Sequence, residues 1–410
     1  MKSYKHLYEK LIDIDNIIKA IHNASKRKKR RREVQEIIDN PWHHANQIIA
    51  MLERGEYTPQ KHILRKITDK SSGKERYIMK PYFFRNMEGK EVYEQVIQHA
   101  VIQVLRPIIM KGVYCHSYGS IPGRGCHSGK RALAGYIKNR KDTKDIKYGL
   151  KCDIHHFYQS INITLLKELL TKKIHDARFL KIIFVILDSN VGLMKGKEIE
   201  MGLPIGFYSS QWLANFFLQN FDHYMKEKLK VKFYIRYMDD FVVLDSNKRK
   251  LHYVLSEIKS YLSNIKLHLK GNYQLFLFDY VRKDNHVVGR PINFMGFKFY
   301  RTRTTLRKPI LKRARRAAKQ IDKAVKENRL NWYCCSRIMS YKGWFKYTDT
   351  KQYVRKYIKP YMHEFRCRKV LRQHGKYLQK IINKRENERR NNNADIDLEQ
   401  FTKFNKTKKA

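Results

Sequence analysis

The sequence has no apolar run close to the roughly 18 residues that a membrane-spanning helix needs, so we expect no such helix. The opening residues Met1-Lys-Ser-Tyr-Lys-His6 lack the apolar core of a signal peptide. Cysteine is scarce, and none of the six cysteines has the C-x-x-C spacing. We therefore expect reduced thiols in a cytoplasmic protein, with neither a disulfide framework nor a zinc site.

Acidic residues are also few, because 38 Asp and Glu stand against 87 Lys and Arg, for a formal net charge of +49. The excess of positive charge runs along the whole chain, which indicates nucleic acid as a partner. Its densest part is the run from Lys26 to Arg32. A solvated helix face is one interpretation of this run, but seven consecutive cations repel one another, and a phosphate backbone explains them better.

The central pattern of the chain is Phe233-Tyr-Ile-Arg-Tyr-Met-Asp-Asp-Phe-Val-Val-Leu244. Two β-branched and aromatic runs flank Asp239 and Asp240, which predicts a strand, a turn and a second strand. Two adjacent carboxylates at a hairpin tip repel each other unless a cation neutralises them, and a hard divalent cation prefers oxygen ligands. An ordinary exposed turn containing Asp is the alternative.

A third carboxylate follows another predicted strand, in Tyr148-Gly-Leu-Lys-Cys-Asp153-Ile-His-His-Phe-Tyr158. Asp153 precedes two aromatic residues and lies well before the helix predicted from about Thr164. Helix capping is therefore a weaker explanation for it. Asp153 is the third acid that a site with two metal ions would need.

The remaining patterns divide the chain into four parts. Residues 1–58 form a helical, basic segment, and residues 59–304 contain the predicted strands. Within this second part, a helical run through Val101 and Leu105 is expected to end before Pro107. Residues 305–383 are predicted to be helical and basic, and residues 384–410 to be a disordered basic tail.

Two glycine-containing segments are candidates for contact with nucleic acid or nucleotide. Ser117-Tyr-Gly-Ser-Ile-Pro-Gly-Arg-Gly-Cys-His-Ser-Gly-Lys-Arg131 fits neither G-x-x-x-x-G-K-[ST] nor G-x-G-x-x-G, which excludes the usual nucleoside-triphosphatase loop. Arg124 in this segment is still a candidate for contact with a phosphate. In the second segment, small residues at Gly206 and Ser210 would let a base pair approach the backbone closely.

Taken together, these motifs resemble the reverse transcriptases. Tyr237-Met-Asp-Asp240 is similar to their catalytic hairpin, and Asp153 to Tyr158 is similar to the motif that supplies the other metal-binding Asp. The resemblance covers about residues 60–300. It implies an α+β right-hand polymerase fold with fingers, an antiparallel-sheet palm and a helical thumb.

The resemblance also implies roles for individual residues. Asp153, Asp239 and Asp240 would be catalytic, and together with the Ile154 carbonyl they would hold two Mg²⁺ ions. Tyr158 is similar to the gate against a ribose 2′-hydroxyl. Further contacts with template or nucleotide would come from Arg76, Lys80, Arg124, Ile205, Gly206, Ser210, Gln211 and Lys270. The primer grip would consist of Phe294, Met295, Gly296 and Phe297.

One segment resembles a particular subfamily. Intron-type enzymes carry Q-G-x-x-x-S-P, whereas this chain has Ile205-Gly-Phe-Tyr-Ser-Ser-Gln211, similar to diversity-generating retroelements. Those enzymes copy a template-repeat RNA with errors at adenines, and the cDNA replaces a variable region of a target gene. The resemblance implies deoxynucleoside triphosphates as substrates, a template RNA and a primer as partners, and a small, basic, oligomeric accessory variability protein. It also implies the cytoplasm of a bacterial or phage-infected cell.

Two groups of alternatives stay open at this point. The first is an intron-type, retron or phage-defence reverse transcriptase with another RNA partner. The second is a non-catalytic RNA-binding protein built on a polymerase fold. Three acidic residues argue against the second alternative, because binding alone does not require a repulsive cluster.

Overall fold

The computed structural model describes residues 3–68, 75–138, 146–194, 196–281, 286–381 and 383. The chain forms two compact units, Met1–Arg290 and Pro291–Ala410. The division falls before the predicted end of the strand-rich part at residue 304, so the short sheet after Pro291 belongs to the second unit. The predicted tail, residues 384–410, lies outside the described residues.

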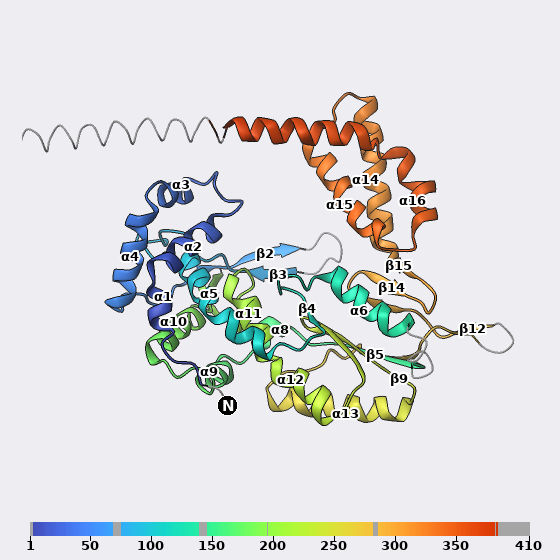
Figure 1. Cartoon of the computed structure of the whole chain (residues 1–410), viewed down its shortest axis with the longest axis horizontal. Helices are drawn as coiled ribbons and strands as arrows, with labels where there is room; N and C mark the ends of the chain where they lie inside the picture. Colours follow the sequence, from blue (N-terminus) through green and yellow to red (C-terminus); the bar gives the residue numbers. More distant parts are fainter. Residues whose placement is uncertain are drawn as a thin grey trace, which may run out of the picture. The chain divides into compact units, whose positions relative to one another are not determined.

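A five-stranded sheet in the order β10-β5-β9-β8-β4 carries the acidic residues (Figure 1). Its strands are β4 (Ser117–Tyr118), β5 (Tyr148–Asp153), β8 (Phe233–Tyr237), β9 (Asp240–Asp245) and β10 (Gln274–Leu277). All neighbours are antiparallel except β4 and β8, which are parallel. The β-branched and aromatic side chains of β8 and β9 are buried, as expected for central strands, except that of Tyr237, which is half-buried. The predicted hairpin and the α+β class are confirmed.

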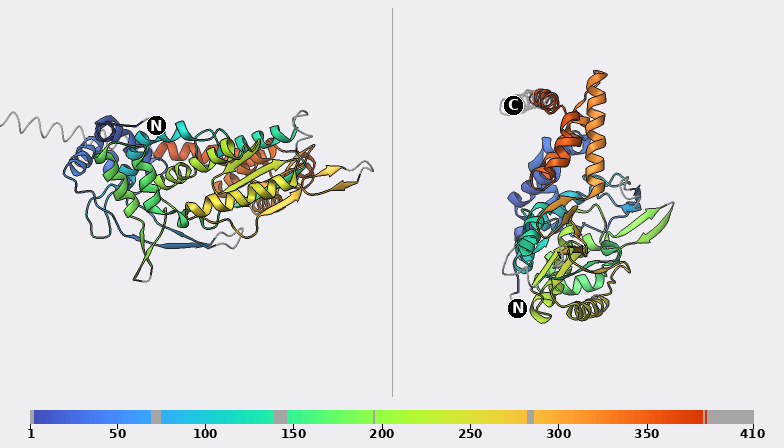
Figure 2. Two further views of the ribbon diagram at one scale, coloured as in Figure 1. Left: turned by 90° about the horizontal axis from the view of Figure 1, so that it is seen from below. Right: turned by 90° about the vertical axis from the view of Figure 1, so that its right-hand side faces the viewer.

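Helices cover this sheet and the core beside it. Helix α13 (Lys248–Asn264) packs against β9 and lies along the sheet in the left view of Figure 2. The chain between β4 and β8 adds several short helices. They are α6 (Cys126–Lys138), α8 (Phe157–Ser160), α9 (Ile163–Thr171), α10 (Ala177–Asp188), α11 (Tyr208–Phe217), α12 (Gln219–His223) and the π-helix η1 (Tyr224–Lys228).

The N-terminal segment is helical, as predicted, and shares its core with the rest of the first unit. Its helices are α1 (Tyr8–Ile12), α2 (Ile14–Ser25), α3 (Arg32–Asp39) and α4 (Pro41–Glu53). Asp176 caps α10 and also accepts hydrogen bonds from the backbone N–H groups of Leu7 (2.7 Å) and Tyr8 (2.9 Å). This carboxylate therefore fastens the N-terminal helices to the middle of the chain.

Helix α5 (Glu94–Gly112) corrects the predicted helix end, because it continues through Pro107. Proline removes one intrahelical hydrogen bond at that point. The next turn stays helical because Ile108 and Ile109 are buried in the core, and Gln219 donates a 2.7 Å hydrogen bond to the Ile109 carbonyl. Tertiary packing thus outweighs the local preference.

Small sheets complete the first unit. One of them is the pair β11 (Tyr280–Val281) and β12 (Val287–Val288). Strands β2 (Arg65–Thr68) and β3 (Glu75–Ile78) form an antiparallel ladder. Another sheet joins β1 (His62–Ile63), β6 (Val191–Met194) and β7 (Lys197–Glu200).

The second unit combines a three-stranded sheet with helices. Its strands are β13 (Ile292–Phe294), β14 (Phe297–Phe299) and β15 (Thr304–Leu306). Its helices are α14 (Lys308–Lys326), α15 (Trp332–Lys346), α16 (Lys351–Tyr357), the 3₁₀ turn η2 (Lys359–Tyr361) and a helix over 364–381. Among the described residues of both units, no helix is long and apolar enough to cross a membrane.

Candidate active site

The backbone register of the central sheet brings the predicted acids together. Asp153, at the end of β5, lies directly opposite Asp240, at the start of β9. The Ile154 N–H donates a 3.1 Å hydrogen bond to the Asp239 carbonyl across the same strand ends. Met238 adopts the left-handed conformation (φ +56°), which turns the chain between β8 and β9. The three predicted acids therefore share one edge of the sheet.

Burial and mutual repulsion disfavour charge on the two hairpin acids. Burial raises the pKa of Asp239, and the charge of Asp153 raises it further, while Lys270 and Arg76 oppose the shift. Burial raises the pKa of Asp240 to about 7, although Lys151 lowers it. Local cations offset this cost, since Lys270 Nζ is 3.0 Å from Asp153 Oδ1 and Lys151 Nζ is 3.2 Å from Asp240 Oδ2.

The donor set fits an open divalent metal site and does not form a complete protein cage. Within the described residues, no three His, Cys, Asp or Glu side chains are grouped so that they could hold a metal. Lysines pair with two of the acids, Lys151 with Asp240 and Lys270 with Asp153. Mg²⁺ commonly uses one or two carboxylates and fills its shell with water and phosphate oxygens. Asp153, Asp239 and a peptide carbonyl provide ligands of that kind.

Tyr158 lies beside these acids. Burial raises the pKa of its hydroxyl, and the charge of Asp239 adds to the increase. The Tyr158 carbonyl accepts a 2.7 Å hydrogen bond from the Leu203 N–H. At Gly202, a Cβ atom would come within 2.5 Å of the same carbonyl, so only glycine fits there. The loop before α11 is thereby fixed against the predicted gate residue.

The segment from Ile205 to Gln211 docks on the chain after β3. The Ile205 carbonyl accepts a 3.0 Å hydrogen bond from the Met79 N–H. Gly206 has φ +121°, and a Cβ atom there would lie 2.0 Å from the Met79 carbonyl oxygen, so the approach requires glycine. Ser210 is buried, whereas Gln211 is exposed on the first turn of α11. Of these side chains, Gln211 is thus accessible to a substrate.

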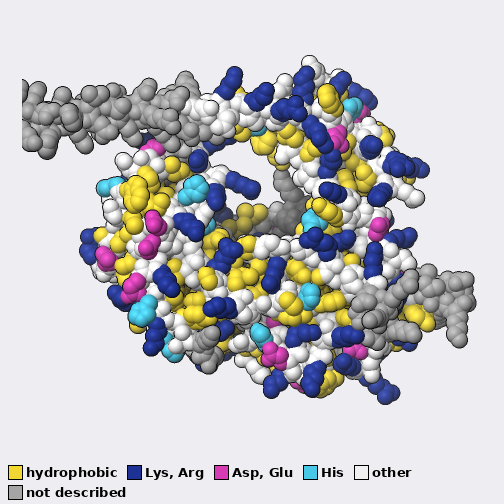
Figure 3. All heavy atoms as spheres, viewed as in Figure 1, with side chains coloured by type: hydrophobic (Ala, Val, Ile, Leu, Met, Phe, Trp, Pro, Cys, Tyr) yellow, Lys and Arg dark blue, Asp and Glu magenta, His cyan; other side chains and the backbone are white. Residues whose placement is uncertain are grey.

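Cations of the basic run lie close to Lys80, which follows β3. Burial lowers the pKa of Lys80, and the charge of Arg31 adds to the effect. Burial also lowers the pKa of Lys28, and the charges of Arg31 and Lys80 add to the decrease. Arg76 is exposed on β3 and acts electrostatically on Asp239. Basic side chains therefore continue from the N-terminal run toward the acids. Figure 3 shows Lys and Arg side chains spread over the face of the molecule that it draws.

Arg124 makes two hydrogen bonds that hold its own loop. Its Nη1 donates a 3.0 Å hydrogen bond to the Tyr114 carbonyl, and its own carbonyl accepts one from the Gly119 N–H. These two bonds close the glycine-containing loop between β4 and α6. No described contact joins Arg124 to Asp153, Asp239 or Asp240.

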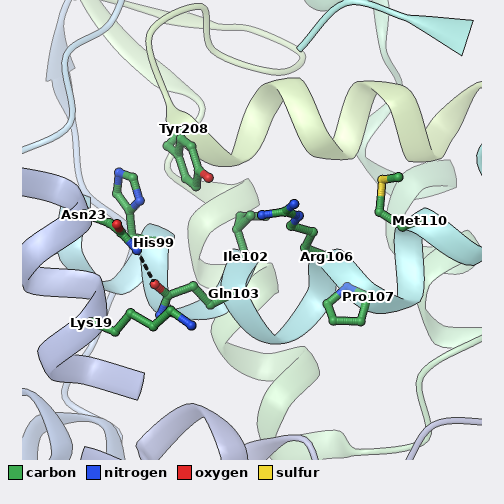
Figure 4. A pocket seen from close by; sticks show the side chains of 9 residues that line it. All are labelled: Lys19, Asn23, His99, Ile102, Gln103, Arg106, Pro107, Met110 and Tyr208. Carbon is green, nitrogen blue, oxygen red and sulfur yellow. Dashed lines mark hydrogen bonds between the residues drawn. The ribbon is translucent and has the colours of Figure 1, made fainter. Parts of the chain in front are cut away.

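A pocket of about 390 Å³ lies between α2, α5 and α11 (Figure 4). The ring of His99 stacks on that of Tyr208, with 3.8 Å between centroids. Lys19 and Arg106 line the same pocket, and no described carboxylate forms an ion pair with either. An adjoining pocket of about 250 Å³ is lined by Lys28, Gly206 and Gln211, among others. A cationic surface therefore adjoins the Ile205–Gln211 segment.

The predicted primer-grip residues form a tight hairpin in the second unit. Met295 (φ +49°) and Gly296 (φ +88°) make the two-residue turn between β13 and β14. Phe294 and Phe297 are buried, and a Cβ atom on Gly296 would lie 3.0 Å from the Trp344 ring. The hairpin is thus packed onto α15, with its turn defined by backbone geometry.

Sequence reasoning missed several residues that support the site. Lys151 precedes Asp153 by two positions, and strand alternation places both on one face, which could have identified it. Asn215, Asp222 and Arg236 are buried polar residues on helical or strand segments that otherwise look apolar. Arg236 could have been identified from the sequence, because a charged residue inside an apolar strand needs a partner.

The chain is similar in sequence to a known protein family and to individual proteins. Residues 85–299, just over half of the chain, match the family model described as "Reverse transcriptase (RNA-dependent DNA polymerase)". Protein YkfC of Escherichia coli K12 is 25% identical over 138 residues, which is 33% of this chain and 35% of that protein. An uncharacterized 91 kDa protein in the cob intron of Schizosaccharomyces pombe is 29% identical over 220 residues, covering 52% of this chain.

The similarity covers only part of these relatives. The chain matches 35% of YkfC and 24% of the intron protein. Among solved structures, telomerase from Candida tropicalis bound to a fragment of telomeric RNA has a TM-score of 0.46 and 15% identity, over 62% of this chain and 47% of that one. The same telomerase without its C-terminal domain has a TM-score of 0.45, also at 15% identity, over 62% and 55%.

Proposed function

Because this chain belongs to the reverse transcriptase (RNA-dependent DNA polymerase) family, we propose that it extends a DNA primer along an RNA template. The observation that carries the proposal is the pairing of Asp153 with Asp240 beside Asp239, inside the region that matches the family. The reaction joins a deoxynucleoside triphosphate to the primer 3′-hydroxyl and releases pyrophosphate. A net charge of +49 suits a partner with a phosphate backbone.

Asp153 and Asp239 would hold two divalent ions, Mg²⁺, with the Ile154 carbonyl as a further ligand and Asp240 assisting. When bound, such ions supply positive charge at the attacking and leaving oxygens. Lys270 neutralises Asp153 at 3.0 Å and is a candidate proton donor to the leaving pyrophosphate.

Other residues position the substrates. Tyr158, beside Asp239, excludes a ribose 2′-hydroxyl, and Arg76 attracts the triphosphate. Gly206 and Gln211 face the new base pair, and the pockets with Lys28, Lys19 and Arg106 hold the template strand ahead of it. We propose that the helices of residues 305–383 form the thumb and that the hairpin Phe294–Phe297 grips the primer.

For the biological role, we propose mutagenic copying of a template-repeat RNA, as in diversity-generating retroelements, with a small basic accessory protein. The support is Ile205 in place of the glutamine of intron-type enzymes, with Gln211 after Ser210. A second candidate is an intron-type enzyme. The observation favouring it is the similarity to a protein encoded in the cob intron.

The test is primer extension by the full-length chain on an RNA template with all four deoxynucleoside triphosphates and Mg²⁺. We expect DNA synthesis that stops on chelation with EDTA and resumes with added Mg²⁺. RNA binding without extension in Mg²⁺ or Mn²⁺ would instead identify a non-catalytic binding protein. Sequencing the cDNA separates the two biological roles, because errors confined to template adenines support the retroelement role and evenly spread errors support the intron type.

A further inference from the structure

The largest charged side chain in the core of the first unit is Arg236, on β8, which is only 1% exposed. Its Nε donates to Asp222 Oδ1 at 2.7 Å, and its Nη2 donates to Asp222 Oδ2 at 2.5 Å. Tyr234, two residues earlier on β8, also donates to Asp222 Oδ1 at 2.7 Å. Burial opposes the charge on Arg236, but the Asp222 carboxylate outweighs it and raises the pKa of the guanidinium.

The third guanidinium nitrogen of Arg236, Nη1, binds the turn between β8 and β9. Arg236 Nη1 donates a 2.9 Å hydrogen bond to the carbonyl of Met238. That carbonyl belongs to the peptide group whose nitrogen is the amide of Asp239. Fixing this carbonyl therefore fixes the peptide plane from which the Asp239 side chain departs.

Asn215 of α11 ties the same turn to its surroundings. Its Oδ1 lies 3.4 Å from Arg236 Nη1, and its amide donates to the Gly119 carbonyl at 3.3 Å and contacts Met238 Sδ at 3.5 Å. Met238 is in the left-handed conformation, which costs a residue with a Cβ atom about 1–2 kcal/mol. Such a conformation persists only where the surroundings over-determine it.

A buried ion pair is weak evidence for stability, because desolvation offsets much of the attraction between the charges. A role in defining a conformation explains the pair better. We propose that Arg236 is a positioning residue, which uses Asp222 as an anchor to hold the Met238 carbonyl and so orients the Asp239 carboxylate toward Asp153. Its effect on the reaction rate rests on the proposed function, whereas its effect on the turn does not.

Arginine is required here because of its shape. The planar guanidinium presents a fixed fork of donors, so two can bind a carboxylate while a third points elsewhere. Lysine keeps the positive charge beside Asp222. Its single ammonium group cannot make the two hydrogen bonds to Asp222 and the one to the Met238 carbonyl at the same time. The variant Arg236→Lys therefore separates charge compensation from the hold on Met238.

Tyr234→Phe is the matched control. Tyr234 lies on the same strand, is fully buried and donates to the same Asp222 oxygen, but it has no hydrogen bond to Met238. Both variants and the wild type are prepared as full-length chains. Three properties are measured: amide hydrogen exchange of a peptide spanning residues 237–240, Mn²⁺ binding by electron paramagnetic resonance, and primer extension normalised to active sites.

We expect Arg236→Lys to exchange faster in this peptide and to bind Mn²⁺ about tenfold more weakly. Its kcat should be about tenfold lower or more, with an unchanged KM for primer–template, because misplacement of about 1 Å can cost about a hundredfold in rate. Tyr234→Phe should stay within about twofold of wild type in all three. If Arg236→Lys matches Tyr234→Phe in exchange and Mn²⁺ binding, the proposal is overturned. If the wild type makes no DNA but the turn loosens as expected, the proposed function fails and the positioning role stands.

Discussion

Asp153 and Asp240 are direct partners in the antiparallel register of β5 and β9, and the Ile154 N–H bonds to the carbonyl of Asp239 beside them. Backbone hydrogen bonds thus set the spacing of these acids, without help from contacts between their side chains. A one-residue slip of this register would turn Asp153 to the opposite face of the sheet. The register is held by the buried side chains of β5 and β9, so the apolar pattern of the strands positions the acidic groups.

The metal assignment predicts that Asp239→Asn abolishes nucleotide incorporation, because an amide is a poor ligand for a hard cation. We expect kcat to fall at least about a thousandfold, which corresponds to about 4 kcal/mol. RNA affinity should stay within about threefold, since the basic residues are unchanged. Asp245→Asn is the control, because Asp245 lies at the far end of β9 and pairs with Lys250 at 2.9 Å. Full activity in Asp239→Asn would contradict the assignment.

The proposed mutagenic role predicts an altered error spectrum for Ile205→Gln. Glutamine would add a hydrogen-bond donor and acceptor beside Gly206, where isoleucine offers neither. We expect misincorporation opposite template adenines to change several-fold, while the rate on other template bases stays within about twofold. Sequencing of cDNA from one defined RNA template measures both. An unchanged spectrum at adenines would count against the retroelement role.

The sequence was sufficient to predict the hairpin, the strand ending at Asp153 and the N-terminal helices. Each has a strong periodic pattern of apolar residues, and burial of those residues decides the local structure. The tight turn at Met295-Gly296 was also predictable, because glycine at a hairpin tip permits the positive φ observed there.

Other features depend on contacts between distant segments. Helix α5 continues past Pro107 because its last turn is buried, which local propensity does not reveal. The bond from the Arg124 guanidinium to the Tyr114 carbonyl joins two residues ten positions apart, which the residue pattern does not reveal. The pairing of Lys151 with Asp240 required the register of two strands, and the anchor of Arg236 required the position of α12.

The link between Asp176 and the N-terminal helices predicts a pH-dependent stability. Burial would raise the pKa of this carboxyl, but the N–H groups of Phe179, Tyr8 and Leu7 donate to it and hold the pKa below its usual value. A lowered pKa in the folded state contributes stability above the pKa of the unfolded chain, near 4, and this contribution is lost as the pH falls through the folded value.

We therefore expect Asp176→Ala to lower the free energy of unfolding by roughly 1–3 kcal/mol at pH 7, from the lost helix cap and two further hydrogen bonds. The difference from wild type should shrink below about pH 4. Urea titrations at several pH values measure it. Asp13→Ala is the control, because Asp13 caps α2 through a single exposed bond to Asn16. A difference that does not vary with pH would show that the carboxylate charge is not responsible.

The pocket beside Tyr208 predicts a specific loss of template affinity. Lys19 and Arg106 line it without a described carboxylate partner, so their charge is available to phosphate groups. For Lys19→Ala with Arg106→Ala, we expect weaker binding of single-stranded RNA. The slope of log affinity against log salt should become shallower by about 1.4, since each neutralised phosphate of a single strand contributes about 0.7. Lys61→Ala is the control, because Lys61 is already paired with Glu198 at 2.6 Å and should leave the slope unchanged. If the double variant has the slope of the control, the template takes another path, and the pocket has no part in holding it.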